Sequence, residues 1–262
     1  MILIVGSNHD DILYFEASLN NKITEKVLNK YEVISGTIFR QDVTIIYGLY
    51  TSYVSSALTS YLLSVHPDIN LVISVGRCIA YSKAFTVGQL AVISKVAFAD
   101  VDQVEETNVQ LGQIPNEPLV LEDESDVFKY FTRILDTHTD VRYTTAVDVS
   151  SNTAYSNSEQ LKSIENKNTL FGLQEKIVLD CNNGGIALVA RQFKVPFISL
   201  KVVEKHLGEM SNAENYAKVL ESYTNIGKAV NIFLYEISIS HVLHAGEGIN
   251  RWENQQLNLE WF

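Results

Sequence analysis

Short apolar runs alternate along this chain with segments whose apolar residues recur at helical spacing. The first run, Ile2–Val5, ends at Gly6, as a buried strand would. Asp10–Asn21 carries apolar residues at three- to four-residue spacing, which predicts a helix. Tyr31–Phe39 and Val43–Leu49 then predict a pair of strands. The chain therefore opens with a strand, a helix and a strand pair.

The same alternation continues through the rest of the chain. Further helices are predicted over Thr51–Val65, Ser125–Leu135, Asn182–Phe193 and Ser211–Leu243, and further strands over Leu71–Val75, Leu90–Phe98, Arg142–Val149, Ile177–Leu179 and Phe197–Val203. This order predicts a single α/β domain over residues 1–243, with a mixed, mostly parallel central sheet flanked by helices, and a C-terminal tail over 244–262. Residues 150–176 are rich in Ser, Asn and Lys and form either a loop over the site or a plain solvated connection.

The strand Leu71–Val75 points to the place of the ligand site, because its apolar run stops at Gly76. Arg77 and Cys78 follow, and the next strand begins after Val87–Gln89. A central strand that ends at a glycine is typical of an α/β protein that opens a ligand crevice at the carboxyl edge of its sheet. We therefore expect the site at this edge.

Composition narrows the possible partners. With 262 residues, 46% hydrophobic and 19% charged, the chain can bury the core of one large domain. A net charge of −11 and a pI near 5.0 argue against nucleic acid or an anionic membrane as a partner. Its two cysteines, Cys78 and Cys181, favour a reducing cytoplasm. The sequence has no apolar run of about 18 residues and no metal-ligand spacing of histidines, so we expect no membrane span, metal or cofactor.

Several short segments occur in the order and spacing of a known family. They are Gly6–Asp11, Gly76–Ile79 with Val87–Gln89 beyond it, Gly112–Pro118, Ser151–Tyr155 and Asp180–Ala187. Across most of its length the chain resembles the 5′-methylthioadenosine/S-adenosylhomocysteine nucleosidases of the purine nucleoside phosphorylase superfamily, with altered catalytic positions. The resemblance implies the nucleoside phosphorylase fold, a nucleoside-like ligand and a homodimer, in which the Gly112–Pro118 loop reaches toward the neighbour's site.

The family uses a carboxylic acid to protonate the departing base, because an adenine anion is a poor leaving group. The resemblance places Lys205 at that position, directly after Glu204. A lysine is charged at neutral pH unless its pKa is strongly lowered, and Glu204 would reach the base only if the chain were re-aimed there. Both residues are candidate catalytic acids, or they form a polar edge or an ion pair.

Two other catalytic carboxylates of the family are also replaced. Asn182 stands where a glutamate accepts the ribose hydroxyls, and it brings no negative charge. Its alternative role is to cap the helix that follows. Asp11 stands where a glutamate orients the attacking water, and its alternative role is to stabilise the start of the first helix.

Arg77 replaces a small residue of the family loop. Its guanidinium would bind an anion, or it would close the site through a salt bridge with Asp11 or Asp180. Cys78 is a small apolar filler rather than a nucleophile, since no base accompanies it in the sequence. The other candidate substrate-binding residues implied by the resemblance are Phe98, Tyr155, Cys181 and Asn182.

Two functions stay open at this point. The protein is an N-glycosidase or ribosyl-transferring enzyme that acts on a nucleoside-like substrate, or it is an inactive family member that serves as a ligand-binding or partner subunit. With Lys205 and Asn182 at the acid and ribose positions, we expect weak or no hydrolysis of methylthioadenosine and S-adenosylhomocysteine. The double change Asn182→Glu, Lys205→Asp should restore part of it.

Overall fold

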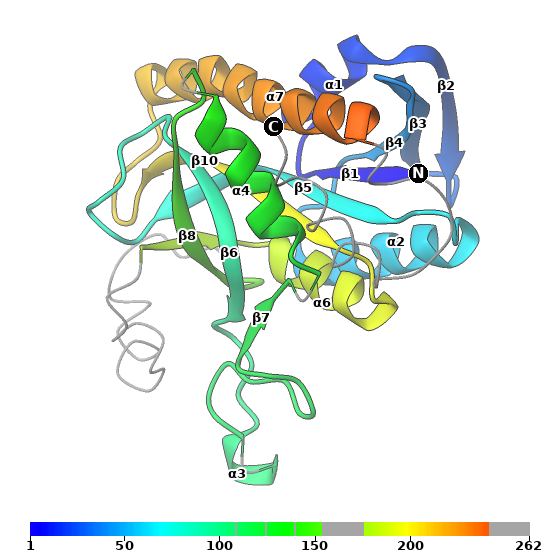
Figure 1. The fold of residues 1–262 in the computed structure, drawn as a ribbon. Coiled ribbons are helices and arrows are strands. Elements are labelled where there is room, and N and C mark those ends of the chain that lie inside the picture. The colour runs from blue at the N-terminus through cyan, green and yellow to red at the C-terminus, as the bar shows by residue number, and fades with distance from the viewer. Residues whose placement is uncertain (108, 124, 139, 154–175, 241–262) are drawn as a thin grey trace, which may run out of the picture.

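The computed structural model describes residues 1–107, 109–123, 125–138, 140–153 and 176–240. Within these residues one mixed sheet is covered by helices, which confirms the predicted single α/β domain (Figure 1). The strands are β1 (Ile2–Gly6), β2 (Asn20–Val27), β3 (Tyr31–Ile38), β4 (Gln41–Ile46), β5 (Leu71–Ala80), β6 (Leu90–Phe98), β7 (Val120–Glu122), β8 (Tyr143–Ser150), β9 (Ile177–Asp180) and β10 (Phe197–His206). The helices are α1 (Leu13–Ser18), α2 (Ser52–Val65), α3 (Val104–Thr107), α4 (Val127–Thr137), α6 (Asn183–Phe193) and α7 (Ala213–Ser240).

The strands lie in the order β10, β6, β8, β9, β5, β1, β4, β3 and β2, with β7 paired to β6. β10 also pairs with β5, so β5, β10, β6, β8 and β9 close into a ring from which β1, β4, β3 and β2 extend. Parallel pairings join β1 to β4 and β5, β5 to β10, and β8 to β6 and β9; the remaining pairings are antiparallel. β1, β4, β5 and β10 therefore run in one direction, and β6, β8 and β9 run in the other.

The core has two layers because the side chains of a strand alternate between the faces of the sheet. In β1, Ile2 and Ile4 pack with α4 and α7, whereas Leu3 and Val5 pack with α2 and α6. Figure 1 shows α7 and α4 on one side of the sheet and α2 and α6 on the other. No helix in the described part of the chain is long and apolar enough to cross a bilayer.

The structure corrects the sequence prediction at three elements. The strand predicted to end before Gly76 continues as β5 to Ala80, because it pairs there with β10 and β9. The helix predicted over residues 10–21 is confined to α1, and β2 follows it at once. The sequence pattern did not indicate β2, because nearly all of its residues are exposed and carry no apolar alternation. The predicted tail and the end of the last predicted helix, from residue 241, lie outside the described residues.

Candidate functional site

A cavity of about 190 Å³ opens at the carboxyl ends of β1, β5, β9 and β10. The side chains that line it include Ser7, Arg77, Asp180, Cys181, Asn182 and Glu204. Four sequence-predicted site residues, Arg77, Cys181, Asn182 and Glu204, are therefore brought together from three separate parts of the chain. Gly76 lets β5 pass close to this group, since a Cβ there would lie 3.2 Å from Ser7 Oγ and 3.3 Å from Asp11 Oδ2.

Asp11 is buried behind the cavity wall, where three donors hold its carboxylate. Oδ2 accepts from the backbone amides of Ser7 and Asn8, both at 2.8 Å, and Oδ1 accepts from the Tyr223 hydroxyl. Burial raises the pKa of Asp11, and the hydrogen bonds from Tyr223 and Asn8 oppose that rise. The N-cap position of α1 is Ile12, so Asp11 anchors the loop after β1 instead of stabilising the helix start.

Lys201 is fully buried in the middle of β10. Its Nζ lies 2.7 Å from Asp180 Oδ2 and donates to Asn182 Oδ1 at 3.2 Å. Burial alone lowers the pKa of Lys201, but the carboxyl groups of Asp180 and Asp148 raise it, and the net shift is upward. The site therefore holds a charged ammonium group within its buried wall.

Asn182 occupies the N-cap position of α6 but its side chain does not cap the helix. Its Nδ2 donates to Ser7 Oγ at 2.7 Å and to the Leu49 carbonyl at 2.9 Å, while Oδ1 accepts from Lys201. The helix is capped by Asp180, whose Oδ1 accepts from the backbone amides of Asn182 and the next residue at 3.1 and 2.9 Å. The capping role considered for Asn182 is therefore wrong.

Asp148 lies deeper in the same network and is completely buried. Its Oδ2 accepts from Asn183 Nδ2 at 2.9 Å, and Asn183 Oδ1 accepts from Ser199 Oγ at 2.9 Å. Burial and the nearby Asp180 carboxylate raise the pKa of Asp148 well above its ordinary value. A proton on Asp148 leaves the Asp180 carboxylate as the direct ion-pair partner of the Lys201 ammonium in this network.

Glu204 reaches the cavity because β10 is irregular at this point. In the pairing with β5 the register shifts between Val203 and Lys205, which makes Glu204 the extra residue of a β-bulge. Glu204 Oε1 lies 3.9 Å from Arg77 Nη1, and about a quarter of each side chain is exposed. Arg77 thus forms its ion pair with Glu204 and with neither of the two aspartates considered from the sequence. The bulge provides the re-aimed backbone that a role for Glu204 required.

With this geometry established, comparisons with known proteins identify the family. The model of the phosphorylase superfamily matches residues 1–237. The chain belongs to the phosphorylase superfamily. The 5′-methylthioadenosine/S-adenosylhomocysteine nucleosidase of Staphylococcus haemolyticus is 22% identical over 244 residues, covering 86% of this chain and 100% of that protein.

Solved structures of other proteins share the fold. The 5′-methylthioadenosine/S-adenosylhomocysteine nucleosidase of Neisseria meningitidis, in complex with methylthio-immucillin-A, has a TM-score of 0.79 at 16% identity, covering 90% of this chain and 98% of that chain. The futalosine hydrolase of Helicobacter pylori has a TM-score of 0.78 at 16% identity, covering 90% and 97%. Two proteins named for different substrates are thus equally similar in structure, and the likeness shows the fold alone.

Several sequence-predicted residues of this superfamily member lie away from the cavity wall. Phe98 packs in the core, and a Cβ on Gly184 would lie 2.6 Å from its ring. Lys205 pairs in register with Ile79 at the end of β5 and is not among the residues that line the cavity. Cys78, by contrast, is among the residues that line the cavity, but it is buried, and burial raises the pKa of its thiol well above the ordinary value, as suits an apolar filler. Tyr155 lies outside the described residues.

Three buried groups that shape this site were not predicted from the sequence, namely Lys201, Asp148 and Tyr223. The signal for Lys201 was present, because a lysine inside the apolar strand Phe197–Val203 needs a buried partner. Tyr223 had no such signal, since it is 212 residues from Asp11 in sequence.

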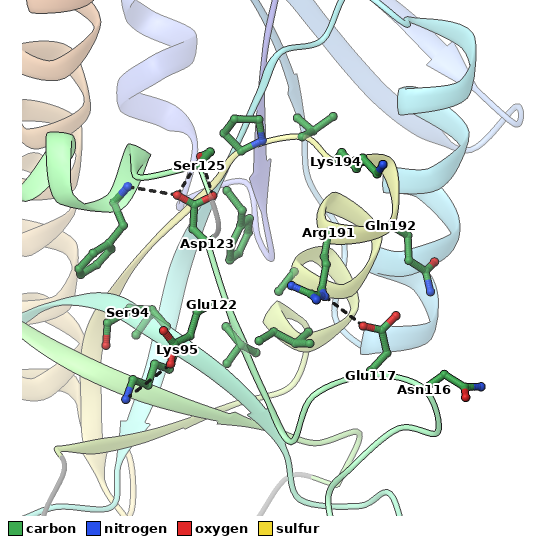
Figure 2. A pocket seen from close by; sticks show the side chains of 18 residues that line it. Ser94, Lys95, Asn116, Glu117, Glu122, Asp123, Ser125, Arg191, Gln192 and Lys194 are labelled. Carbon is green, nitrogen blue, oxygen red and sulfur yellow. Dashed lines mark hydrogen bonds and ion pairs between the residues drawn. The ribbon is translucent and has the colours of Figure 1, made fainter. Parts of the chain in front are cut away.

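A second, larger cavity of about 580 Å³ lies between α6, β6 and β7 (Figure 2). Two ion pairs cross its walls: Arg191 Nε lies 3.0 Å from Glu117 Oε2, and Lys95 Nζ lies 3.7 Å from Glu122 Oε1. Glu117 belongs to the Gly112–Pro118 loop, which therefore contacts α6 of its own chain. None of the candidate catalytic or substrate-binding residues that the structure describes lines this cavity.

Proposed function

We propose that this phosphorylase-superfamily protein binds a nucleoside-like ligand in the 190 Å³ cavity and cleaves its N-glycosidic bond. The observation that carries the proposal is the convergence of Arg77, Asn182 and Glu204 on one crevice at the carboxyl ends of β5, β9 and β10. Polar groups from separate strands that meet at such an edge are the usual form of a ligand site in α/β proteins. The names of the similar proteins support a nucleoside as the ligand class.

The size of the cavity indicates which part of the ligand the described walls hold. Complete small-molecule sites typically enclose about 300 Å³ or more, and this cavity has about 190 Å³. In our proposal these walls hold one portion of the nucleoside, around the bond to be broken. The rest of the ligand extends toward the opening.

In this proposal each residue of the site has a separate role in hydrolysis. The Glu204 carboxylate lines the cavity, where it can accept a proton from water and stabilise positive charge at the anomeric carbon. Asp11 holds the backbone of Ser7 and Asn8, which form part of the cavity wall, and so acts as a positioning residue. Lys201 fixes the orientation of the Asn182 amide.

A second candidate function is ligand binding without cleavage. The contacts of Asn182 favour this second function. Its side-chain oxygen already accepts from Lys201, and it carries no charge that could stabilise a developing cation. In this case the protein would retain nucleosides and release no base.

Chromatographic measurement of base release separates the two functions. The purified protein is incubated with adenosine, inosine, methylthioadenosine and nicotinamide riboside, and a thermal-shift assay with the same compounds reports binding independently. Cys181→Trp fills the cavity and should abolish release, while the control Gln192→Trp places the same side chain at the larger cavity and should leave release intact. Binding without release would favour the second candidate, and neither binding nor release would refute both.

A further inference from the structure

The described walls of the cavity offer no group suited to protonate a departing base. Glu204 already forms an ion pair with Arg77 and accepts a hydrogen bond from Ser211 Oγ at 3.0 Å. Asp180 accepts or pairs through both of its oxygens, with Lys201 and with the amides at the start of α6. The Cys181 thiol lines the cavity, but burial raises its pKa to about 11, so it is a weak acid. A neutral purine would therefore leave as a poorly stabilised anion.

The charges around the cavity also disfavour a negative ligand. The cavity and its buried surroundings contain two cationic side chains, Arg77 and Lys201. They also contain three carboxyl groups, Asp11, Asp180 and Glu204. The carboxylate oxygens of Asp11 accept from two backbone amides and from the Tyr223 hydroxyl, which is the pattern of an ionised carboxylate. The site thus carries an excess of negative charge that attracts a cation.

An aromatic side chain provides a further contact for a cation. Tyr50 lines the cavity and has 61% of its surface exposed, so its ring is available to a ligand. The face of a tyrosine ring attracts a positively charged group, including the planar cation of a nitrogen heterocycle.

From these three features we infer that the substrate is a nucleoside whose base is already cationic, joined to the sugar through a quaternised ring nitrogen as in a pyridinium nucleoside. Such a base leaves as a neutral molecule and needs no acid, so the missing proton donor does not prevent cleavage. The inference rests on the proposed function and names its substrate class.

The reaction balances with water as the only co-reactant. Water adds to the anomeric carbon while the carbon–nitrogen bond breaks, and the bonding electron pair returns to the ring nitrogen, which becomes neutral. The proton lost by the water passes to the Glu204 carboxylate and then to solvent. The products are the free sugar, the neutral base and one proton.

The test compares cationic and neutral nucleosides as substrates of the whole protein. Nicotinamide riboside is set against adenosine and methylthioadenosine, and 7-methylguanosine against guanosine, from which it differs by one methyl group and the charge. Each kcat/KM is divided by the uncatalysed rate of the same compound, because quaternised nucleosides hydrolyse faster on their own. We expect the cationic compounds to exceed the neutral ones by about 10²-fold or more, the size of one strong electrostatic contact. We also expect no fall of kcat/KM on the alkaline side from loss of a general acid.

Variants at Glu204 test its part in this preference. Glu204→Gln should lower kcat/KM for nicotinamide riboside by about tenfold or more, and Glu204→Asp, which keeps the charge, should retain most of it. Glu122→Gln is the matched control, since this residue lies on β7 at the other cavity and is 59% exposed. Neutral nucleosides cleaved as well as cationic ones would overturn the inference and leave the proposed function standing. Binding of the cationic probes without base release would also overturn it, and failure to cleave or bind any nucleoside would overturn both.

Discussion

Replacing Lys201 by methionine removes the ammonium that faces Asp180 in the core. The Lys201 side chain is fully buried, the Asp180 side chain is 3% exposed, and their charged atoms are 2.7 Å apart. Methionine has a similar length and is apolar, so the change leaves the Asp180 carboxylate buried without its cation. Breaking one side of a buried ion pair costs about 3–5 kcal/mol. This is a large share of the roughly 5–15 kcal/mol by which a protein is stable, and it corresponds to a fall in Tm of about 6–20 °C for a chain of this size.

Urea unfolding monitored by circular dichroism measures this effect. Asp180→Asn keeps an oxygen that can cap α6 and removes the charge, so the double variant Lys201→Met, Asp180→Asn should be more stable than Lys201→Met alone. Lys218→Met is the control, because it breaks an exposed ion pair with Glu214 and should leave the urea midpoint unchanged. A loss of stability below about 1 kcal/mol in Lys201→Met, or additive effects in the double variant, would contradict this reasoning. Either result would show that the Asp180 carboxylate is compensated without Lys201.

Other predictions concern pH, activity and assembly. Burial and the Asp180 carboxylate raise the pKa of Asp148, so the folded chain holds a proton that the unfolded chain releases above the ordinary pKa of 3.8. The free energy of unfolding should therefore fall as the pH rises from 3.8 toward the raised pKa. Asp148→Asn should flatten that fall in urea midpoints measured across pH. Wild-type protein should hydrolyse methylthioadenosine far more slowly than the ~10 s⁻¹ typical of enzymes. The double change Asn182→Glu, Lys205→Asp, expected from the sequence to restore part of this activity, should not do so, because Lys205 does not line the cavity and the Asn182 amide donates to Ser7 and Leu49. A wild-type rate in the usual range would contradict our account of the site. We also propose a homodimer through the exposed Tyr53 and Tyr61 of α2. Light scattering should show a dimer for the wild type and a monomer for Tyr53→Glu, Tyr61→Glu, and a monomeric wild type at micromolar concentration would exclude it.

The sequence by itself determined the fold class, and it predicted the edge at which we propose the site. The alternation of apolar runs and helical spacing was enough for the α/β architecture, because burial of one face dictates that pattern locally. Arg77 and Asn182 each follow an apolar run read as a central strand, so both could be assigned to one crevice before their contacts were known. The structure brings them together through the antiparallel pairing of β5 with β9.

Only the tertiary structure decided how the site residues are used. The bulge that turns Glu204 toward Arg77 depends on how β10 pairs with β5, and strand register is not written in the hydrophobic pattern of either strand alone. The Asn182 amide takes its orientation from Lys201, on a different strand. Asp11 is held by Tyr223 from the last helix of the described chain. These contacts join residues far apart in sequence, so they exist only once the sheet and its covering helices have packed together.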